Sequence, residues 1–192
     1  ETAAKRSRDI ELTLKRLVRL SERLMQLARA EGGRLRRSET VDLRSVATLI
    51  ADEILHGSES VRATREFPQP PVISDIDPDA FGILCRNLIE NALRHGAPDG
   101  EISISLTEEG VLTVINDGSV VAPEVLARLT DRFERGQSKS DGSGLGLAIV
   151  RTLAERLGGS FELLSPAPGR TDGFAARLTL PLFDRPEDGT GI

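Results

Sequence analysis

Apolar residues recur at alternating steps of three and four along residues 8–31, which is the spacing of an amphipathic helix. Gly32 and Gly33 follow and are expected to end this helix. Because one helix cannot bury an apolar stripe alone, we expect it to pair with another helix, in this chain or in a second copy. Packing back onto the chain's own domain is the alternative. The stripe consists of Ile10, Thr13, Leu17, Leu20, Leu24 and Leu27, widened by Leu14 and Val18.

After Gly33, helical and strand patterns are mixed without regular alternation, which predicts an α+β fold, a two-layer sandwich with helices on one face of a mixed sheet. Asp77 followed by Pro78 is a typical N-cap and first-turn pair, and it predicts a helix that runs to about His95 and ends at Gly96. We expect further helices over 44–55, near 123–131 and after the glycines at 142–146. We expect strands over 41–43, 59–67, 71–74, 101–107, 110–116, 160–164 and 173–181, the fourth and fifth of them forming a hairpin.

Charge is distributed unevenly, which indicates separate modules. The first 37 residues contain 11 Lys and Arg against 5 Asp and Glu, whereas the remainder contains 14 against 25, for a net charge of −5. The basic segment lacks interleaved aromatic residues and its apolar stripe already needs a partner, so we expect no nucleic-acid binding. The single cysteine, Cys85, excludes an internal disulfide. No apolar run approaches the length of about 18 residues that a membrane span requires.

The stretch from Asp141 to Val150 is the most informative one of the chain. Gly142, Gly144 and Gly146 alternate there and lead directly into an apolar helical pattern. Glycine lets backbone N–H groups close around an anion, and the N-terminus of the following helix adds its positive dipole end. The stretch predicts a phosphate cradle, although glycines before a helix can also be ordinary loop residues.

The helix predicted from Pro78 carries a polar face opposite its apolar one. At about 100° per residue, Asn87 and Asn91 share this face with Glu90, Arg94 and His95. Amide oxygens suit a hard cation such as Mg²⁺, which also takes phosphate oxygens and water. Arg94 could contact phosphate and His95 could contact a purine. A merely solvated face is the alternative.

Two further segments complete the pattern. Asn116, Asp117 and Gly118 end a strand, where an acceptor could bind an adenine amino group. Residues 132–136, with the sequence Arg-Phe-Glu-Arg-Gly, place an aromatic side chain between charges just before the glycine loop.

Together these segments resemble the motifs of bacterial two-component sensor histidine kinases. Residues 87–96 resemble the N box, 116–118 the first glycine box, 132–136 the F box, and 141–147 the second glycine box. Residues 8–33 are similar to the second helix of the dimerisation and phosphoacceptor hairpin. The resemblance implies a Bergerat-type ATP-binding sandwich over 38–183, preceded by residues 1–37 as hairpin helix and link and followed by a flexible tail at 184–192.

The resemblance also implies roles for individual residues. Asn91 would be the Mg²⁺ ligand with Asn87 in the same site, Arg94 would contact phosphates, and His95 would flank the nucleotide. Asn116 would accept a hydrogen bond from adenine, with Asp117 as the second candidate. The stretch from Phe133 to Gly146 would form a mobile lid. The remaining residues implied to bind ATP are Gly118, Arg135, Gly142, Ser143, Gly144, Leu145 and Leu147.

Two departures, and one contrast with gyrase-like relatives, qualify the resemblance. Asn116 stands where the family usually has Asp, and Val120 where it has a second Gly. Gyrase-like relatives carry a glutamate at the position of Asn87, and an amide cannot act as that general base, so phosphoryl transfer is favoured over hydrolysis. No H box is present, and neither His56 nor His95 is a suitable phosphoacceptor.

We therefore expect the ATP-binding domain of a sensor histidine kinase, which transfers the ATP γ-phosphoryl group to a histidine outside this chain. This fragment of a longer kinase would not phosphorylate itself. The expected partners are a response-regulator receiver domain and a second copy of the kinase, and the expected location is a cytoplasmic domain of a protein tethered to the inner membrane. The alternatives are a serine kinase of the anti-sigma-factor type and a non-catalytic nucleotide-binding or dimerisation module.

Overall fold

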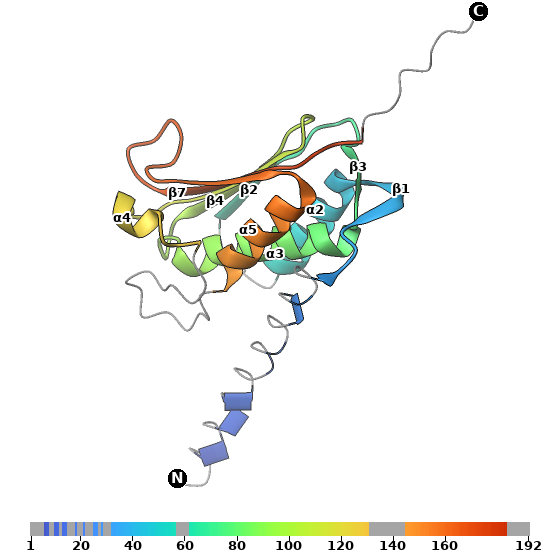
Figure 1. Ribbon diagram of the computed structural model, residues 1–192. Coiled ribbons are helices and arrows are strands. Elements are labelled where there is room, and N and C mark those ends of the chain that lie inside the picture. Colours follow the sequence, from blue (N-terminus) through green and yellow to red (C-terminus); the bar gives the residue numbers. More distant parts are fainter. Residues whose placement is uncertain are drawn as a thin grey trace, which may run out of the picture.

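The computed structural model describes residues 32–56, 62–130 and 145–183, together with single positions between residues 6 and 28. A five-stranded sheet forms one layer and three helices form the other (Figure 1). The predicted α+β sandwich with helices on one face is confirmed. None of the described helices has the length and apolar character that crossing a membrane would require.

The five-stranded sheet is mixed, and its strand order is β2-β4-β5-β7-β6. Only β2 and β4 run parallel, while the other neighbouring pairs are antiparallel. Side chains of β4 and β5 alternate between buried and half-buried, so one face of the sheet packs on the helices and the other stays partly open. The strands are β2 (Arg62–Glu66), β4 (Glu101–Leu106), β5 (Val111–Asn116), β6 (Ser160–Leu164) and β7 (Phe174–Thr179).

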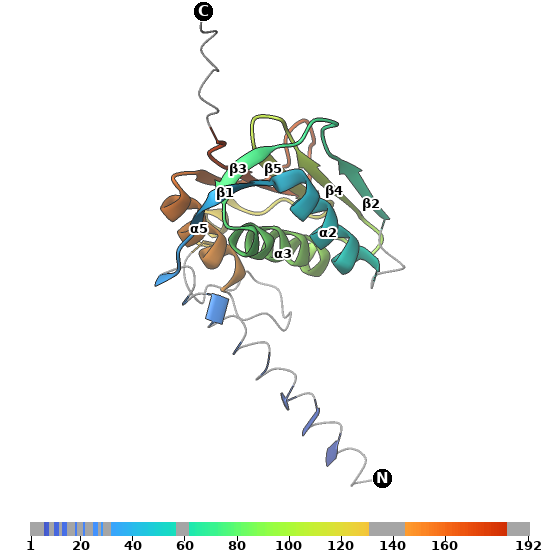
Figure 2. The ribbon, with the colours of Figure 1, turned by 90° about the vertical axis from the view of Figure 1, so that its right-hand side faces the viewer.

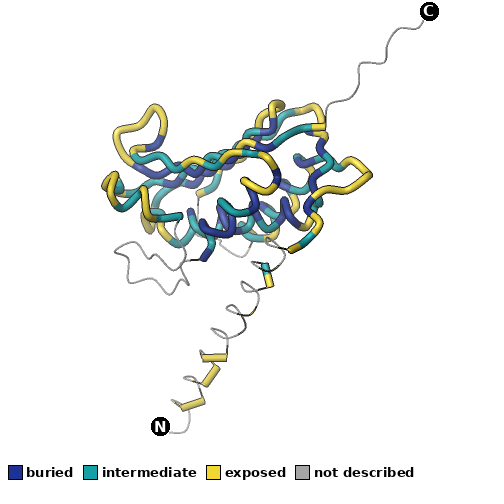
Figure 3. The backbone as a smooth tube through the Cα atoms, viewed as in Figure 1, coloured by how far each residue is buried: buried dark blue, intermediate teal, exposed yellow. Residues whose placement is uncertain are grey.

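Three helices cover the buried face of the sheet: α2 (Leu43–His56), α3 (Pro78–His95) and α5 (Gly146–Leu157). Figure 2 shows α3 in the middle, with α2 and α5 on either side, in agreement with its contacts to both. Buried positions gather between the two layers (Figure 3). The largest fully buried side chains of the helices include Phe81, Leu84, Leu88, Ile149 and Leu153.

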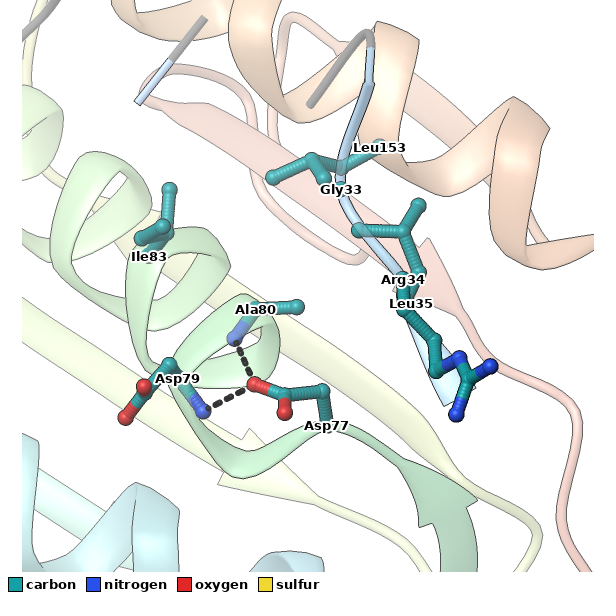
Figure 4. A pocket seen from close by; sticks show the side chains of 8 residues that line it. All are labelled: Gly33, Arg34, Leu35, Asp77, Asp79, Ala80, Ile83 and Leu153. Atoms are coloured by element: carbon teal, nitrogen blue, oxygen red, sulfur yellow. Dashed lines mark hydrogen bonds between the residues drawn. The ribbon is translucent and has the colours of Figure 1, made fainter. Parts of the chain in front are cut away.

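The start and end of α3 follow from its terminal residues. The Oδ1 atom of Asp77 accepts hydrogen bonds from the backbone N–H groups of Asp79 and Ala80 at 2.9 and 3.1 Å (Figure 4). At the other end, Gly96 N–H donates to the carbonyl of Ala92 at 2.8 Å. The bounds predicted for this helix are confirmed.

A smaller antiparallel pair joins β1 (Arg36–Asp42) to β3 (Ile73–Ile76). The strand predicted at 41–43 is therefore too short, and the strand predicted at 71–74 begins two residues late in the structure. Contacts between distant segments account for the difference, because the Arg36 guanidinium binds both carboxylate oxygens of Asp75, at 2.7 and 2.9 Å. Arg36 also donates to the carbonyl of Leu157 at the end of α5, at 2.8 Å.

The other predicted elements agree to within a few residues. The β4–β5 hairpin is confirmed, and so is the strand at 160–164. The predicted helix near 123–131 is shorter, since α4 spans Pro123–Leu126 and turns follow it to residue 130. Of the predicted strand at 59–67, only the part from Arg62 is described. The described positions between residues 6 and 28 are helical, as predicted.

Candidate nucleotide-binding site

The polar face of α3 gathers the predicted ligands along one line. Asn91 and Arg94 lie within about 40° of Asn87 around the helix axis. Asn87 is buried, with 6% of its surface exposed, whereas Asn91 and Arg94 are half-buried and His95 is exposed. The sandwich therefore places a row of polar side chains at the edge of its core rather than on a fully solvated surface.

Asn87 faces the start of α5. Its Nδ2 atom donates to the carbonyl of Ile83, one turn earlier, at 2.8 Å, and to Oε1 of Gln26 at 3.4 Å. Because both amide hydrogens are used, Oδ1 is the atom that remains for a ligand. A β-carbon built on Gly146 would lie 3.1 Å from this Oδ1 atom. The structure thus brings the N box and the end of the second glycine box into direct contact.

The C-terminal end of α3 meets the first glycine box. A β-carbon on Gly96 would lie 3.4 Å from Cβ of Asn116, and one on Gly118 would lie 3.8 Å from the carbonyl oxygen of His95. The backbone of Ala97 also donates to the carbonyl of Asp117 at 2.9 Å. From Asn87 to Gly96 the helix rises about 13 Å. The two clusters therefore form the two ends of one elongated site along α3.

Asn116 presents an acceptor atom at this end that no described residue engages. Asn116 is 3% exposed, and its Nδ2 atom donates to the carbonyl of Asp117 at 3.1 Å. Its Oδ1 atom has no partner within the described parts of the chain, yet no fully buried polar side-chain atom there lacks one. It follows that Oδ1 of Asn116 reaches accessible space. This arrangement favours Asn116 as the base acceptor.

Asp117, the second candidate, is engaged in contacts within the fold. Its carboxylate accepts hydrogen bonds from the backbone N–H of Glu101 at 2.8 Å and from Arg170 at 2.5 Å. These bonds, with the charges of Arg170 and Arg62, outweigh burial and lower the pKa of Asp117. The carboxylate therefore joins the β6–β7 loop to the end of β5, and each of its oxygens already accepts one hydrogen bond.

His95 adds no positive charge to the site at neutral pH. Although His95 is exposed overall, partial loss of water around its ring lowers its pKa, and the neighbouring charge of Arg94 lowers it further. The other histidine, His56, is exposed at the end of α2, and its Nδ1 atom lies 2.6 Å from the carbonyl of Asp52.

Part of the predicted site lies outside the described residues, namely Phe133, Arg135, Gly142, Ser143 and Gly144. The last three predicted positions are described. Leu145 is fully buried and Leu147 is 8% exposed, so their side chains belong to the core. Of these three, Gly146 is the one that borders the polar face of α3.

The amide oxygens on this face suit a cation whose other ligands come from water and phosphate. Asn87 and Asn91 offer neutral amide oxygens, and the described parts of the chain hold no group of three or more His, Cys, Asp or Glu that could bind a metal. Mg²⁺ fits such a site when phosphate oxygens and water complete its octahedron.

Two residues near the site were not predicted. Gln26 contacts Asn87 across 61 positions of sequence, and Arg170 contacts Asp117 across 53. Neither lies in a recognisable motif, so the sequence offered no signal for them. A cavity of about 220 Å³ lies elsewhere, between the segment 33–35 and the first turns of α3, with Leu153 of α5 on its wall (Figure 4). It contains none of the predicted ATP ligands.

Comparison with known proteins identifies the family. Residues 76–184 match the family described as histidine kinase-, DNA gyrase B-, and HSP90-like ATPases, which is more than half of the chain. The chain belongs to this ATPase family. The matched segment includes both ends of the site along α3 and the glycine loop between α4 and α5.

Sensor histidine kinases are among the proteins similar to this chain within the ATPase family. The sensor histidine kinase TrcS of Mycobacterium tuberculosis is 30% identical over 187 residues, which is 92% of this chain and 36% of TrcS. The probable sensor kinase SilS of Salmonella typhimurium is 32% identical over 78% of this chain and 33% of its own length. This chain thus spans about a third of these relatives.

Solved structures share the fold. The histidine kinase AdeS of Acinetobacter baumannii superimposes with a TM-score of 0.69 at 20% identity, over 91% of this chain and 83% of that one. The full-length kinase ShkA, solved in complex with AMPPNP, has a TM-score of 0.68 at 22% identity, over 86% of this chain and 35% of ShkA. At this level of identity the likeness concerns the Bergerat-type sandwich, and it supports the fold class predicted from the motifs.

Proposed function

We propose that this chain binds Mg-ATP along α3 and transfers the γ-phosphoryl group to a histidine on a hairpin outside it. The contact of Asn87 with Gly146 is the observation that carries the proposal, because it joins a potential metal ligand to the predicted phosphate loop. ATPase family membership and the AMPPNP bound by ShkA support it.

The two ends of the site suit the two ends of the nucleotide. Oδ1 of Asn116 would accept a hydrogen bond from the adenine amino group, with Gly118 leaving room beside it. His95 would flank the nucleotide in its neutral form. Arg94 would contact phosphates, and Asn87 and Asn91 would hold the cation. Mg²⁺, when bound, would neutralise charge on the phosphates.

The residues at the phosphate end favour transfer to a supplied acceptor over hydrolysis. Asn87 has both amide hydrogens engaged by Ile83 and Gln26 and carries no basic group that could activate water. Catalysis would rest on positioning and charge neutralisation. In the transfer, the bond from the γ-phosphorus to the leaving oxygen of ADP breaks, a phosphorus–nitrogen bond forms, and the imidazole loses a proton.

The setting of this reaction belongs to the same proposal. Residues 1–37 would be the second helix of a dimerisation hairpin and its link, 38–183 the catalytic domain, and 184–192 a tail. The exposed apolar side chains at Ile10, Leu14 and Val18 would pair in a homodimer. The phosphoryl group would pass to an aspartate of a response-regulator receiver domain. The domain would be cytoplasmic within a protein tethered to the inner membrane.

Incubation with labelled Mg-ATP tests the proposal. The chain is mixed either with a separate hairpin domain that carries a phosphoacceptor histidine or with a serine-bearing anti-sigma-factor antagonist. We expect acid-labile, alkali-stable phosphate on the hairpin and none on the chain itself. Acid-stable phosphoserine on the antagonist would contradict transfer to histidine and support the serine-kinase alternative. Acid-labile phosphate on the chain incubated alone would contradict the claim that the acceptor histidine lies outside it.

A further inference from the structure

Gln26 is the one half-buried residue among the described positions before Gly33. The others, including Ile10, Leu14, Val18 and Met25, are exposed. Oε1 of Gln26 accepts a hydrogen bond from Nδ2 of Asn87 at 3.4 Å. The N-terminal helix therefore reaches the polar face of α3 through a side chain that contacts a proposed metal ligand.

The chain directly after this helix is fixed to the domain. Arg156 donates to the carbonyl of Gly33 at 3.1 Å, and the backbone of Asp77 donates to the carbonyl of Leu35 at 2.9 Å. In contrast, a β-carbon on Gly32 would meet no atom within 4 Å. Gly32 therefore lies beside an anchored linker at a position where glycine leaves the backbone little restricted.

The cavity described above lies between this linker and the first turns of α3. Ile83, one turn before Asn87, lies on its wall opposite Gly33 and Leu35 (Figure 4). Asn87 itself is not among the residues that line this space. The hydrogen bond from Asn87 to Gln26 connects the helix to the site directly.

The two hydrogen bonds of Asn87 fix the plane of its amide. Ile83 and Gln26 each take one hydrogen of Nδ2, and Oδ1 is thereby turned towards Gly146. Outer partners of this kind orient metal ligands and raise affinity by preventing their rotation. We infer that Gln26 is a positioning residue, which sets the Mg-ATP affinity of the site by holding Asn87 from the N-terminal helix. This inference rests on the proposed function of Asn87.

A displacement of the helix that removed Gln26 would then leave Asn87 with one bond and a freer amide. The affinity of the site for Mg-ATP would fall, while affinity for the nucleotide without metal would not. The position of the helix is in this way coupled to the nucleotide site through one side chain.

Calorimetric titration with AMPPNP, in Mg²⁺ and separately in EDTA, tests the inference. Gln26→Met keeps the length of the side chain but removes the acceptor, and we expect about two- to tenfold weaker binding in Mg²⁺ and no change in EDTA. Gln26→Glu keeps an acceptor oxygen and should retain the parent affinity. Ser21→Ala, on an exposed position of the same helix, is the control and should match the parent.

The side-chain amide signals of Asn87 in the nucleotide-free protein give a second readout, assigned with Asn87→Ala. Gln26→Met should shift them and Ser21→Ala should not. Unchanged amide signals, or an equal loss of affinity with and without Mg²⁺, would overturn the positioning role. Absence of AMPPNP binding to the parent chain would instead refute the proposed function, and the amide signals would still decide whether Gln26 holds Asn87.

Discussion

Replacing Gly146 by alanine should weaken Mg-ATP binding without lowering the stability of the fold. The new β-carbon would lie 3.1 Å from Oδ1 of Asn87, closer than the 3.4–4 Å of ordinary van der Waals contact. Asn87 must then move by a few tenths of an ångström against its bonds to Ile83 and Gln26. Weakening a hydrogen bond of this kind costs about 1 kcal/mol, which corresponds to roughly fivefold lower Mg-ATP affinity.

The free energy of unfolding of Gly146→Ala should rise slightly or stay unchanged. Alanine is favoured over glycine by up to about 1 kcal/mol inside a helix, and by less at the first residue of α5. Gly82→Ala is the matched control, because Gly82 lies within α3 and its β-carbon would be 3.7 Å from Cδ1 of Ile50. We expect this control to raise the free energy of unfolding by about 0.5–1 kcal/mol and to leave Mg-ATP affinity unchanged.

Urea unfolding and calorimetric titration of both variants measure the two quantities independently. The reasoning would be refuted if Gly146→Ala bound Mg-ATP as tightly as the parent, because Asn87 could not then present its oxygen at the phosphate end. An equal loss of affinity in Gly82→Ala would also contradict it, since that position faces α2 and not the site.

Further predictions concern residues at the two ends of α3. Asn116→Leu removes the base acceptor and should weaken Mg-ATP binding at least about tenfold by calorimetry, whereas Asp117→Ala should mainly cost about 1–2 kcal/mol of unfolding free energy in urea. Asp77→Ala removes the cap of α3 and should cost about 1 kcal/mol. Burial raises the pKa of Asp77, but its hydrogen bonds, above all the one from Arg37, lower it overall. The stabilisation by this carboxylate is therefore present above about pH 4 and is lost as the pH falls. Asp77→Asn should flatten that loss in urea titrations. The lowered pKa of His95 makes stability fall as pH drops below about 6.5, and His95→Gln should reduce this fall.

The elements predicted well are those that carry their own end signals. Asp77, Pro78 and Gly96 fix α3 through local hydrogen bonds, and the polar bend before Gly110 fixes the β4–β5 hairpin. The length of β1 was underestimated because its sequence, Arg-Arg-Ser-Glu-Thr-Val-Asp, shows little alternation of apolar and polar residues. Its pairing depends on contacts made 39 positions away by Arg36, which no local pattern reveals.

Motifs predicted which residues would form the candidate site, and the structure supplied their arrangement. The approach of Asn87 to Gly146 follows from the packing of α3 on α5 rather than from either motif. The choice between Asn116 and Asp117 also needed the fold, because Arg170 reaches Asp117 from the distant β6–β7 loop. The contact of Gln26 could not be predicted either, because Gln26 is one polar residue among many in the segment predicted as a long helix.

Calorimetric titration of the chain and of Asn91→Ala with AMPPNP and Mg²⁺ tests the central claim most directly. Asn91 is half-buried on the same face of α3 as Asn87, and its amide is proposed to hold the cation. We predict measurable binding by the parent chain and at least about tenfold weaker binding by Asn91→Ala. No binding to the parent, or equal binding by both proteins, would contradict an Mg-ATP site along α3.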